Sequence, residues 1–175
     1  MRHRCAGLAV LGSYHGQLRS AILRCKRPSG EPLVAALAGL LVGRHRQTFT
    51  DWMVDLVVPV PMHWSRRIVR GTSAADELAA EIAGRLALSC RPALRRSVAT
   101  RMQNEFPIEA RRGNVANAFQ VRSDVRGKTI LVVDDVCTTG ATLAACSIAL
   151  TVAGASAVYA AALAKADRSP DAGDD

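Results

Sequence analysis

The stretch TILVVDDVCTTGATL, residues 129–143, decides the fold of this chain. It opens with Thr129–Val133, a run that is β-branched or apolar without alternation, which is typical of a strand buried on both faces in a parallel sheet. Two adjacent carboxylates follow, Asp134 and Asp135, and then a turn of small and hydroxyl-bearing residues. An apolar helical pattern continues to Gly154. This order predicts a strand, an acid pair, a turn and a helix.

The turn has the chemistry of an anion site. Backbone N–H groups and threonine hydroxyls at a helix N-terminus favour a phosphate, because the helix dipole is positive there. Gly140 lets the backbone approach that phosphate closely. Asp134 and Asp135 can accept hydrogen bonds from sugar hydroxyls or help to hold a divalent cation. The alternative is a structural strand-to-helix turn whose acids only cap the helix.

The segment Ile130–Thr142 resembles the phosphoribosyl-pyrophosphate (PRPP) loop of type I phosphoribosyltransferases. That loop has four apolar residues, two acids, two variable positions and then Thr-Thr/Ser-Gly-x-Thr, and the segment matches it at every fixed position. It matches neither a Walker A loop nor a GxGxxG turn. The resemblance implies that Asp134 and Asp135 are catalytic and hold the ribose hydroxyls. It implies a PRPP-binding loop made of Val136, Cys137, Thr138, Thr139, Gly140, Ala141 and Thr142.

A basic loop follows the stretch Leu56–Pro61, which is typical of a short buried strand that ends in a proline turn. Proline cannot donate to a strand ladder, so this strand must stop near Pro59. Ligands bind at the carboxyl ends of strands in open α/β sheets, which is where this loop begins. The resemblance implies that its arginines neutralise the pyrophosphate; the alternative is a solvated basic loop. These arginines are Arg66, Arg67 and Arg70.

The remaining patterns alternate between helix and strand. They predict an α/β fold with a largely parallel central sheet flanked by helices, of the type I phosphoribosyltransferase kind. Residues 1–54 are expected to form a short N-terminal helical hood, 55–165 the phosphoribosyltransferase-like core and 166–175 a disordered tail. The segment 100–112 has no clean period and suggests a lid over a phosphate site or an ordinary surface loop. Helices are predicted over 14–26, 33–42 and 73–88, and further strands within 92–99, 114–121 and 156–163.

Further motifs, in their order along the chain, resemble the ComF family of phosphoribosyltransferase-like proteins. Two features depart from that family. Many relatives begin with a four-cysteine zinc module, whereas only Cys5 lies in that region here, and the usual Arg-Gly-Phe-Asn-Gln is replaced by residues 70–74, RGTSA. The matching residues are Tyr14, Gly16, Leu18 and Lys26, then Pro59-Val60-Pro61, Arg70-Gly71, Thr100 with Gln103, Arg111 with Asn114, and Phe119.

Composition narrows the class of protein. Lys+Arg 23 against Asp+Glu 15 gives a net charge of +8, and nearly all of the cations are arginines, which suit phosphate and equally suit nucleic acid. The five cysteines are scattered without a CxxC pair, which indicates reduced thiols in a cytoplasmic protein and no zinc knuckle. No apolar run reaches the roughly 18 residues that a membrane span requires.

Three functions remain open at this stage. The first is an enzyme, a pentosyl-transferring phosphoribosyltransferase that uses Mg²⁺ to displace pyrophosphate from PRPP with a nitrogen acceptor that the sequence does not identify. No protein metal site is predicted, because Mg²⁺ is expected to bind through the ligand near Asp134 and Asp135. The second is a ComF-type competence accessory that binds single-stranded DNA or a helicase partner. The third is a PRPP sensor without turnover, and a homodimer is an open alternative for the assembly.

Overall fold

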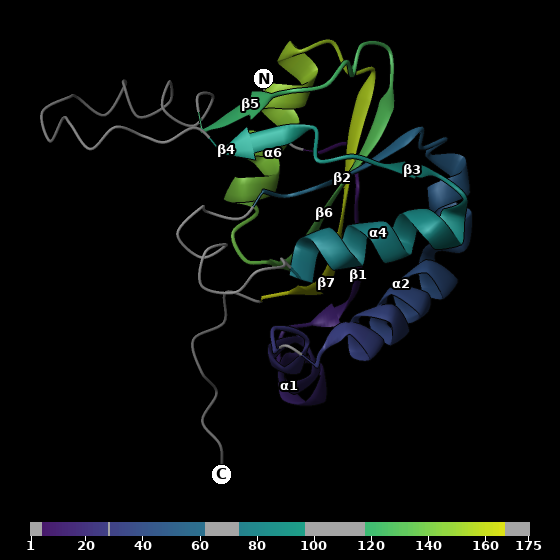
Figure 1. Cartoon of the computed structure of the whole chain (residues 1–175), viewed down its shortest axis with the longest axis vertical. Helices are drawn as coiled ribbons and strands as arrows, with labels where there is room; N and C mark the ends of the chain where they lie inside the picture. Colours follow the sequence, from purple (N-terminus) through teal and green to yellow (C-terminus); the bar gives the residue numbers. More distant parts are fainter. Residues whose placement is uncertain (1–4, 28, 62–73, 97–117, 167–175) are drawn as a thin grey trace, which may run out of the picture.

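The computed structural model describes residues 5–27, 29–61, 74–96 and 118–166 (Figure 1). A five-stranded sheet in the order β1-β7-β6-β2-β3 forms the centre, and every neighbouring pair in it runs parallel. The predicted α/β class with a largely parallel sheet is confirmed. The strands of this sheet are β1 (Leu8–Ser13), β2 (Leu56–Pro59), β3 (Ser89–Cys90), β6 (Thr129–Cys137) and β7 (Ala157–Lys165).

The central strand β6 is buried on both faces, as the run of apolar residues predicts. Ile130, Leu131, Val132 and Val133 are each 0% exposed. Their side chains alternate between two hydrophobic clusters, so that Leu131 and Val133 join one and Ile130 and Val132 join the other. Both faces of the sheet are therefore covered, which is the arrangement that parallel strands require.

Helices cover the sheet on each side. The helices α1 (Gly16–Cys25), α2 (Glu31–Asp51) and α4 (Ala74–Leu86) supply one cluster. The helix α6 (Ala141–Val152) supplies the other, together with the antiparallel pair β4 (Leu94–Arg96) and β5 (Phe119–Val121). Figure 1 shows α2 and α4 on one side of the sheet and α6 on the other. None of the described helices is long and apolar enough to cross a membrane.

Several features of the fold differ from the sequence prediction. Strand β1 lies where no element was predicted, because an edge strand that is half-exposed along most of its length has a weak apolar pattern. Helix α2 runs on to Asp51 through a kink at His45, whose Nε2 lies 2.9 Å from the Val10 carbonyl oxygen. Strand β6 continues to Cys137 instead of ending at Val133. The N-terminal region thus supplies a strand and a core-covering helix as well as α1.

The two neighbours of β6 end at different places. Pairing with β7 continues from Asp134 opposite Ala162 as far as Cys137. Pairing with β2 ends at Pro59 opposite Val133, where the Val60 N–H donates to the Val133 carbonyl at 2.8 Å. Because the chain leaves β2 toward β3 and leaves β6 toward β7, this is the topological switch point of the sheet, where ligands bind in folds of this kind.

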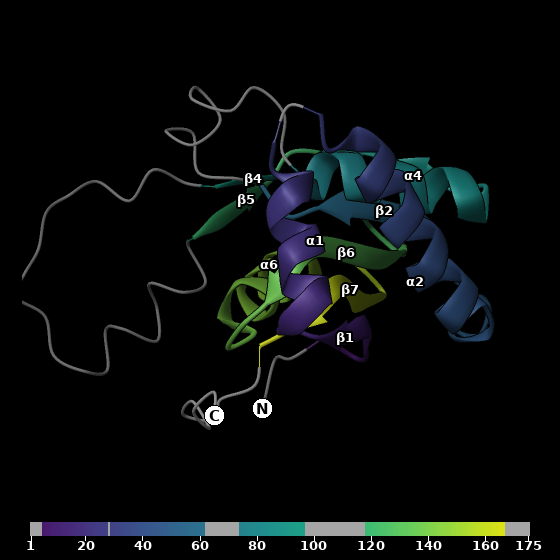
Figure 2. The same ribbon diagram turned by 90° about the horizontal axis from the view of Figure 1, so that it is seen from below.

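The helix α1 lies at this same end of the sheet. In Figure 1 it sits below the strands, and in Figure 2, seen from below, it lies in front of β6 and β7. We call α1 the hood helix. The predicted boundaries at residues 54 and 165 stay predictions, and residues 167–175 of the predicted tail lie outside the described residues.

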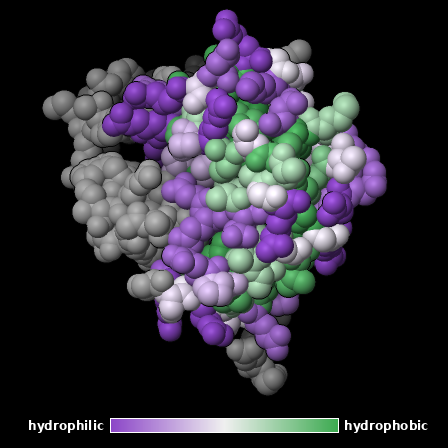
Figure 3. Space-filling model, turned by 45° about the vertical axis from the view of Figure 1, so that its right-hand side comes forward, coloured by the Kyte–Doolittle hydropathy of each residue, from purple (hydrophilic) through white to green (hydrophobic). Residues whose placement is uncertain are grey.

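The burial of β6 gives a first prediction, for Leu131→Ala. Truncating this fully buried side chain should lower the free energy of unfolding by about 2–5 kcal/mol, because a cavity remains in a two-sided core. Urea denaturation measures this. The matched control is Leu40→Ala, since Leu40 is 60% exposed on the α2 side of the molecule, where Figure 3 shows hydrophobic residues among hydrophilic ones. A loss below about 1 kcal/mol for Leu131→Ala would contradict the two-sided burial.

Candidate functional site

The turn between β6 and α6 has the backbone of an anion site. Gly140 is the N-cap of α6 with φ +75°, in the left-handed region where an L side chain is strained. The Thr139 hydroxyl accepts a hydrogen bond from the Ala141 N–H at 3.3 Å, and the Ala144 N–H donates to the Gly140 carbonyl at 2.9 Å. The N–H groups of Thr142 and Leu143 precede that first helical bond, so they have no acceptor within the helix itself.

The predicted loop residues lie together around this turn. Thr138 and Thr139 are exposed, and so are Ala141 and Thr142 on the first turn of α6. Val136 is half-buried and packs against the cluster that contains α1, α2 and α4. The structure thus gathers the loop at the carboxyl end of β6, while its contacts with PRPP stay a prediction.

The acid pair follows the part of β6 that is buried on both faces. Asp134 and Asp135 are half-buried, and each carboxylate accepts a hydrogen bond from the next backbone amide. The Asp135 N–H donates to Asp134 Oδ1 at 2.9 Å, and the Val136 N–H donates to Asp135 Oδ1 at 2.8 Å. These bonds fix both carboxylates with respect to the strand.

The two acids differ in their electrostatic surroundings. Burial, and next the charge of Asp135, raise the pKa of Asp134 from 3.8 to about 7. The charge of Asp134 also helps to raise the pKa of Cys146 on α6, after the larger effect of burial. Burial raises the pKa of Cys25 on α1, and the charges of Glu77 and then Asp135 add to this effect. The charges of the two acids thus reach cysteines on both α6 and α1.

A lysine from the hood helix completes this arrangement. Lys26 is the C-cap residue of α1, and its Nζ lies 2.6 Å from Asp135 Oδ2. Lys26 has no predicted role in the site, although it is one of the residues that resemble the ComF family. The contact joins two segments far apart in the chain, which neither periodicity nor spacing can predict.

Cys137 lies at the loop but is poorly suited to be a nucleophile. Its side chain is buried, and burial, followed by the charge of Asp134, raises the pKa of its thiol. The thiol therefore stays protonated, whereas a nucleophilic cysteine needs a lowered pKa. The cysteine acts as a small filler at a variable position of the loop. All the described cysteines are free thiols.

The other candidate residues fall partly outside the described residues. This holds for Arg66, Arg67 and Arg70, and for the predicted lid over 100–112. What the structure does place is the root of the basic loop, since Val60 is hydrogen-bonded to the residue before the acid pair. Within residues 5–27, 29–61, 74–96 and 118–166, no group of three His, Cys, Asp or Glu side chains could hold a metal ion.

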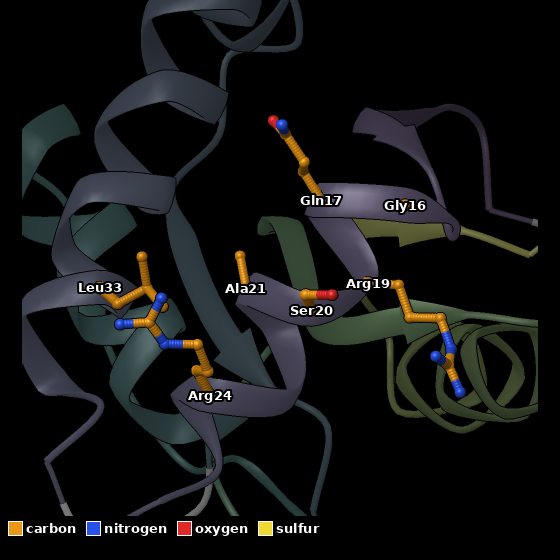
Figure 4. A pocket seen from close by; sticks show the side chains of 7 residues that line it. All are labelled: Gly16, Gln17, Arg19, Ser20, Ala21, Arg24 and Leu33. Carbon is orange, nitrogen blue, oxygen red and sulfur yellow. The ribbon is translucent and has the colours of Figure 1, made fainter.

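A hollow of about 600 Å³ lies on the hood helix (Figure 4). It is open to solvent along one face of α1, with Leu33 of α2 at its side. Two arginines, Arg19 and Arg24, flank it, and Figure 4 shows their side chains pointing in different directions. The acid pair does not line this hollow.

Comparison with known proteins identifies relatives that match most of this chain. A family model described as the phosphoribosyl transferase domain matches residues 29–174. The DNA utilization protein YhgH of Escherichia coli K12 is 31% identical over 86% of this chain and 68% of its own length. Competence protein F of Haemophilus influenzae is 27% identical over 78% of this chain and 62% of its own. This chain thus spans about two thirds of the length of these relatives.

A solved structure supports the fold. Glutamine PRPP amidotransferase from B. subtilis, in complex with ADP and GMP, superposes with a TM-score of 0.56. The match covers 83% of this chain and 30% of that one, at 19% sequence identity. At this identity the likeness establishes the fold alone.

The raised pKa of Asp134 predicts an unusual pH dependence of stability. The folded protein keeps this carboxyl protonated up to about pH 7, whereas the unfolded chain releases the proton near 3.8. The folded state binds more protons between these values, so the free energy of unfolding falls as pH rises through this window. Between about pH 5 and about pH 8, the free energy of unfolding of the wild type should fall by on the order of 1–2 kcal/mol more than that of Asp134→Asn. Urea denaturation at several pH values measures this difference.

The matched control for this prediction is Asp124→Asn. Hydrogen bonds from Arg126 lower the pKa of Asp124 to about 2, so this group is ionised in both states above about pH 5. Its variant should follow the wild-type pH dependence. Parallel curves for Asp134→Asn and the wild type would show that Asp134 has an ordinary pKa.

Proposed function

This chain belongs to the phosphoribosyl transferase domain family, in its ComF branch, and we propose that it binds PRPP with Mg²⁺ where β6 meets α6. We propose further that it transfers phosphoribose to a nitrogen acceptor and releases pyrophosphate. One observation carries this proposal. An acid pair lies six and seven residues before the first residue of α6, whose N-terminus follows at the switch point of a parallel sheet.

Each part of the ligand has a chemical counterpart in this arrangement. The N–H groups and hydroxyls of Thr138, Thr139 and Thr142, with the backbone of Gly140, suit the 5′-phosphate. The Asp134 and Asp135 carboxylates suit the ribose hydroxyls as acceptors of hydrogen bonds. The arginines Arg66, Arg67 and Arg70 are assigned to the pyrophosphate by resemblance to the family.

The described residues fit Mg²⁺ held mainly by its ligand. No side-chain cage of three donors exists among them, and Mg²⁺ commonly binds through substrate phosphates, water and one or two carboxylates. Asp134 and Asp135 are the carboxylates next to the proposed site. Bound there, Mg²⁺ would supply charge neutralisation for the departing pyrophosphate.

The protein's task in such a reaction is positioning and electrostatics. Positive charge develops on the ribose ring as the bond to pyrophosphate breaks, and the nitrogen acceptor forms the new bond. A half-buried carboxylate beside the ring stabilises that positive charge more strongly than water does. The turn holds the phosphate end still, which keeps the reacting carbon in line with the acceptor.

The direct test is PRPP binding measured by calorimetry in the presence of Mg²⁺. Asp134→Asn combined with Asp135→Asn should weaken binding by roughly a hundredfold, because two carboxylate acceptors of the ribose hydroxyls are lost. Asp124→Asn is the control for a lost carboxylate outside the site, since Asp124 is an exposed carboxyl near the other end of β6. Wild-type protein that does not bind PRPP would refute the proposed function.

Turnover is tested separately with a pyrophosphate-release assay. The protein is mixed with PRPP and Mg²⁺ and then with a panel of nitrogenous bases. Release that depends on one base would identify the acceptor and establish the transferase. Binding without release against the whole panel would establish a PRPP sensor instead.

A role in handling DNA is the second candidate, because two kinds of relatives are named for DNA utilization and competence. The net charge of +8 supports it, and the arginine-flanked hollow on α1 offers an exposed surface for phosphates. Arg19→Gln with Arg24→Gln should then weaken binding of a single-stranded oligonucleotide. The slope of log affinity against log salt should shrink by about 1.4, at about 0.7 for each phosphate contact.

Fluorescence anisotropy at several salt concentrations measures both quantities. The control is Arg122→Gln with Arg126→Gln, which removes two exposed arginines from the segment that leads into β6. Equal losses for the two pairs would assign the binding to net charge rather than to the hood helix. A wild-type protein without salt-sensitive DNA binding would exclude this candidate.

A further inference from the structure

The ion pair between Lys26 and Asp135 is the place where the hood helix reaches the candidate sugar site. Lys26 follows the last residue of α1, and Asp135 lies near the end of β6. The distance from Nζ to Oδ2 is 2.6 Å, and the two side chains are 30% and 22% exposed. The contact is therefore reachable from solvent on the side where a ligand would bind.

The backbone that carries Lys26 is held firmly. Ile22 and Cys25, in the last turns of α1, are buried in the cluster between the hood helix, α2 and the sheet. The Arg27 N–H donates to the Arg24 carbonyl at 3.1 Å, which closes the helix end around Lys26. The ammonium is thus brought to β6 by a packed element rather than by a free chain.

The Asp135 carboxylate is held at both of its oxygens. Oδ1 accepts from the Val136 N–H at 2.8 Å, and Oδ2 receives the Lys26 ammonium. An ionised carboxylate has about four acceptor positions, so two bonds orient it and still leave room for a ribose hydroxyl. Without the lysine, only one oxygen would be fixed and the group could turn about its Cβ–Cγ bond.

We propose that Lys26 is a positioning residue for the sugar site, which acts by orienting the Asp135 carboxylate toward the ribose hydroxyls. This inference rests on the proposed function, because it assigns Lys26 a part in the same site. Lys26 stays paired with Asp135 when the ligand is bound, so that the hood helix supports ribose recognition. The role is specific to ligands with a ribose, and the phosphate groups do not depend on it.

The test compares Lys26→Met, Lys26→Arg and Lys128→Met with the wild type. The chain has three lysines, and Lys128 directly precedes the opposite end of β6, so its variant removes the same charge far from Asp135. Calorimetry measures the dissociation constants of two probes, ribose 5-phosphate and inorganic pyrophosphate, both with Mg²⁺. Thermal unfolding of each free variant checks the fold, and a partly exposed pair should contribute little to it.

Lys26→Met should weaken the binding of ribose 5-phosphate about tenfold and change the binding of pyrophosphate less than about twofold, since only the oriented hydrogen bond is lost. Lys26→Arg should stay within about threefold of the wild type, because a guanidinium can also hold the carboxylate. Lys128→Met should bind both probes as the wild type does.

Three results would overturn the inference and leave the proposed function standing. They are an unchanged affinity of Lys26→Met for ribose 5-phosphate, an equal loss for both probes, and an equal loss in Lys128→Met. Failure of the wild type to bind PRPP would instead remove the proposed function, and the inference with it.

Discussion

The unequal ending of the two strands beside β6 is the constraint on which the site depends. β7 keeps pairing with β6 as far as Cys137, whereas β2 stops at Pro59. Along the acid pair, β6 is therefore still hydrogen-bonded to β7 on one side. On its other side it no longer pairs with β2. A sheet that ended evenly would either bury both carboxylates completely or leave them on an unsupported coil. The uneven end keeps them half-buried and fixed in place.

The position of the two carboxylates at this uneven end determines their electrostatic surroundings. Burial, and next the charge of Asp135, raise the pKa of Asp134, and the Lys26 ammonium pairs with Asp135. The turn that follows leads into the N-terminus of α6, where the helix dipole is positive. One short segment therefore carries carboxylates, which accept hydrogen bonds, followed by a helix N-terminus, whose N–H groups donate them. A sugar phosphate offers the matching groups, hydroxyls that donate and phosphate oxygens that accept.

The sequence predicts the parts of this molecule that are governed by local pattern. The apolar run of β6, the proline stop of β2 and the amphipathic α4 all have a strong local signal, and each lies close to its predicted position. β1 was missed because an edge strand buries little, and β3 because it has only two residues. The end of β6 depends on pairing with β7, and the Lys26 contact depends on the hood helix. Both are contacts between distant segments, which local periodicity cannot predict. The arginine loop remains a prediction from resemblance.

The small β4–β5 pair has a consequence for the segment between its two strands. Leu94 and Phe119 are buried against the α6 side of the sheet, and the Arg96 guanidinium lies 5.8 Å from the Phe119 ring. Both roots of the chain between Arg96 and Ala118 are therefore anchored independently of what lies between them. The entropy of joining two fixed ends grows only slowly with the length of the chain between them, so a change of length between Arg96 and Ala118 should cost little free energy of folding. The β4–β5 pair thus closes this side of the core whatever the length of the segment that it brackets.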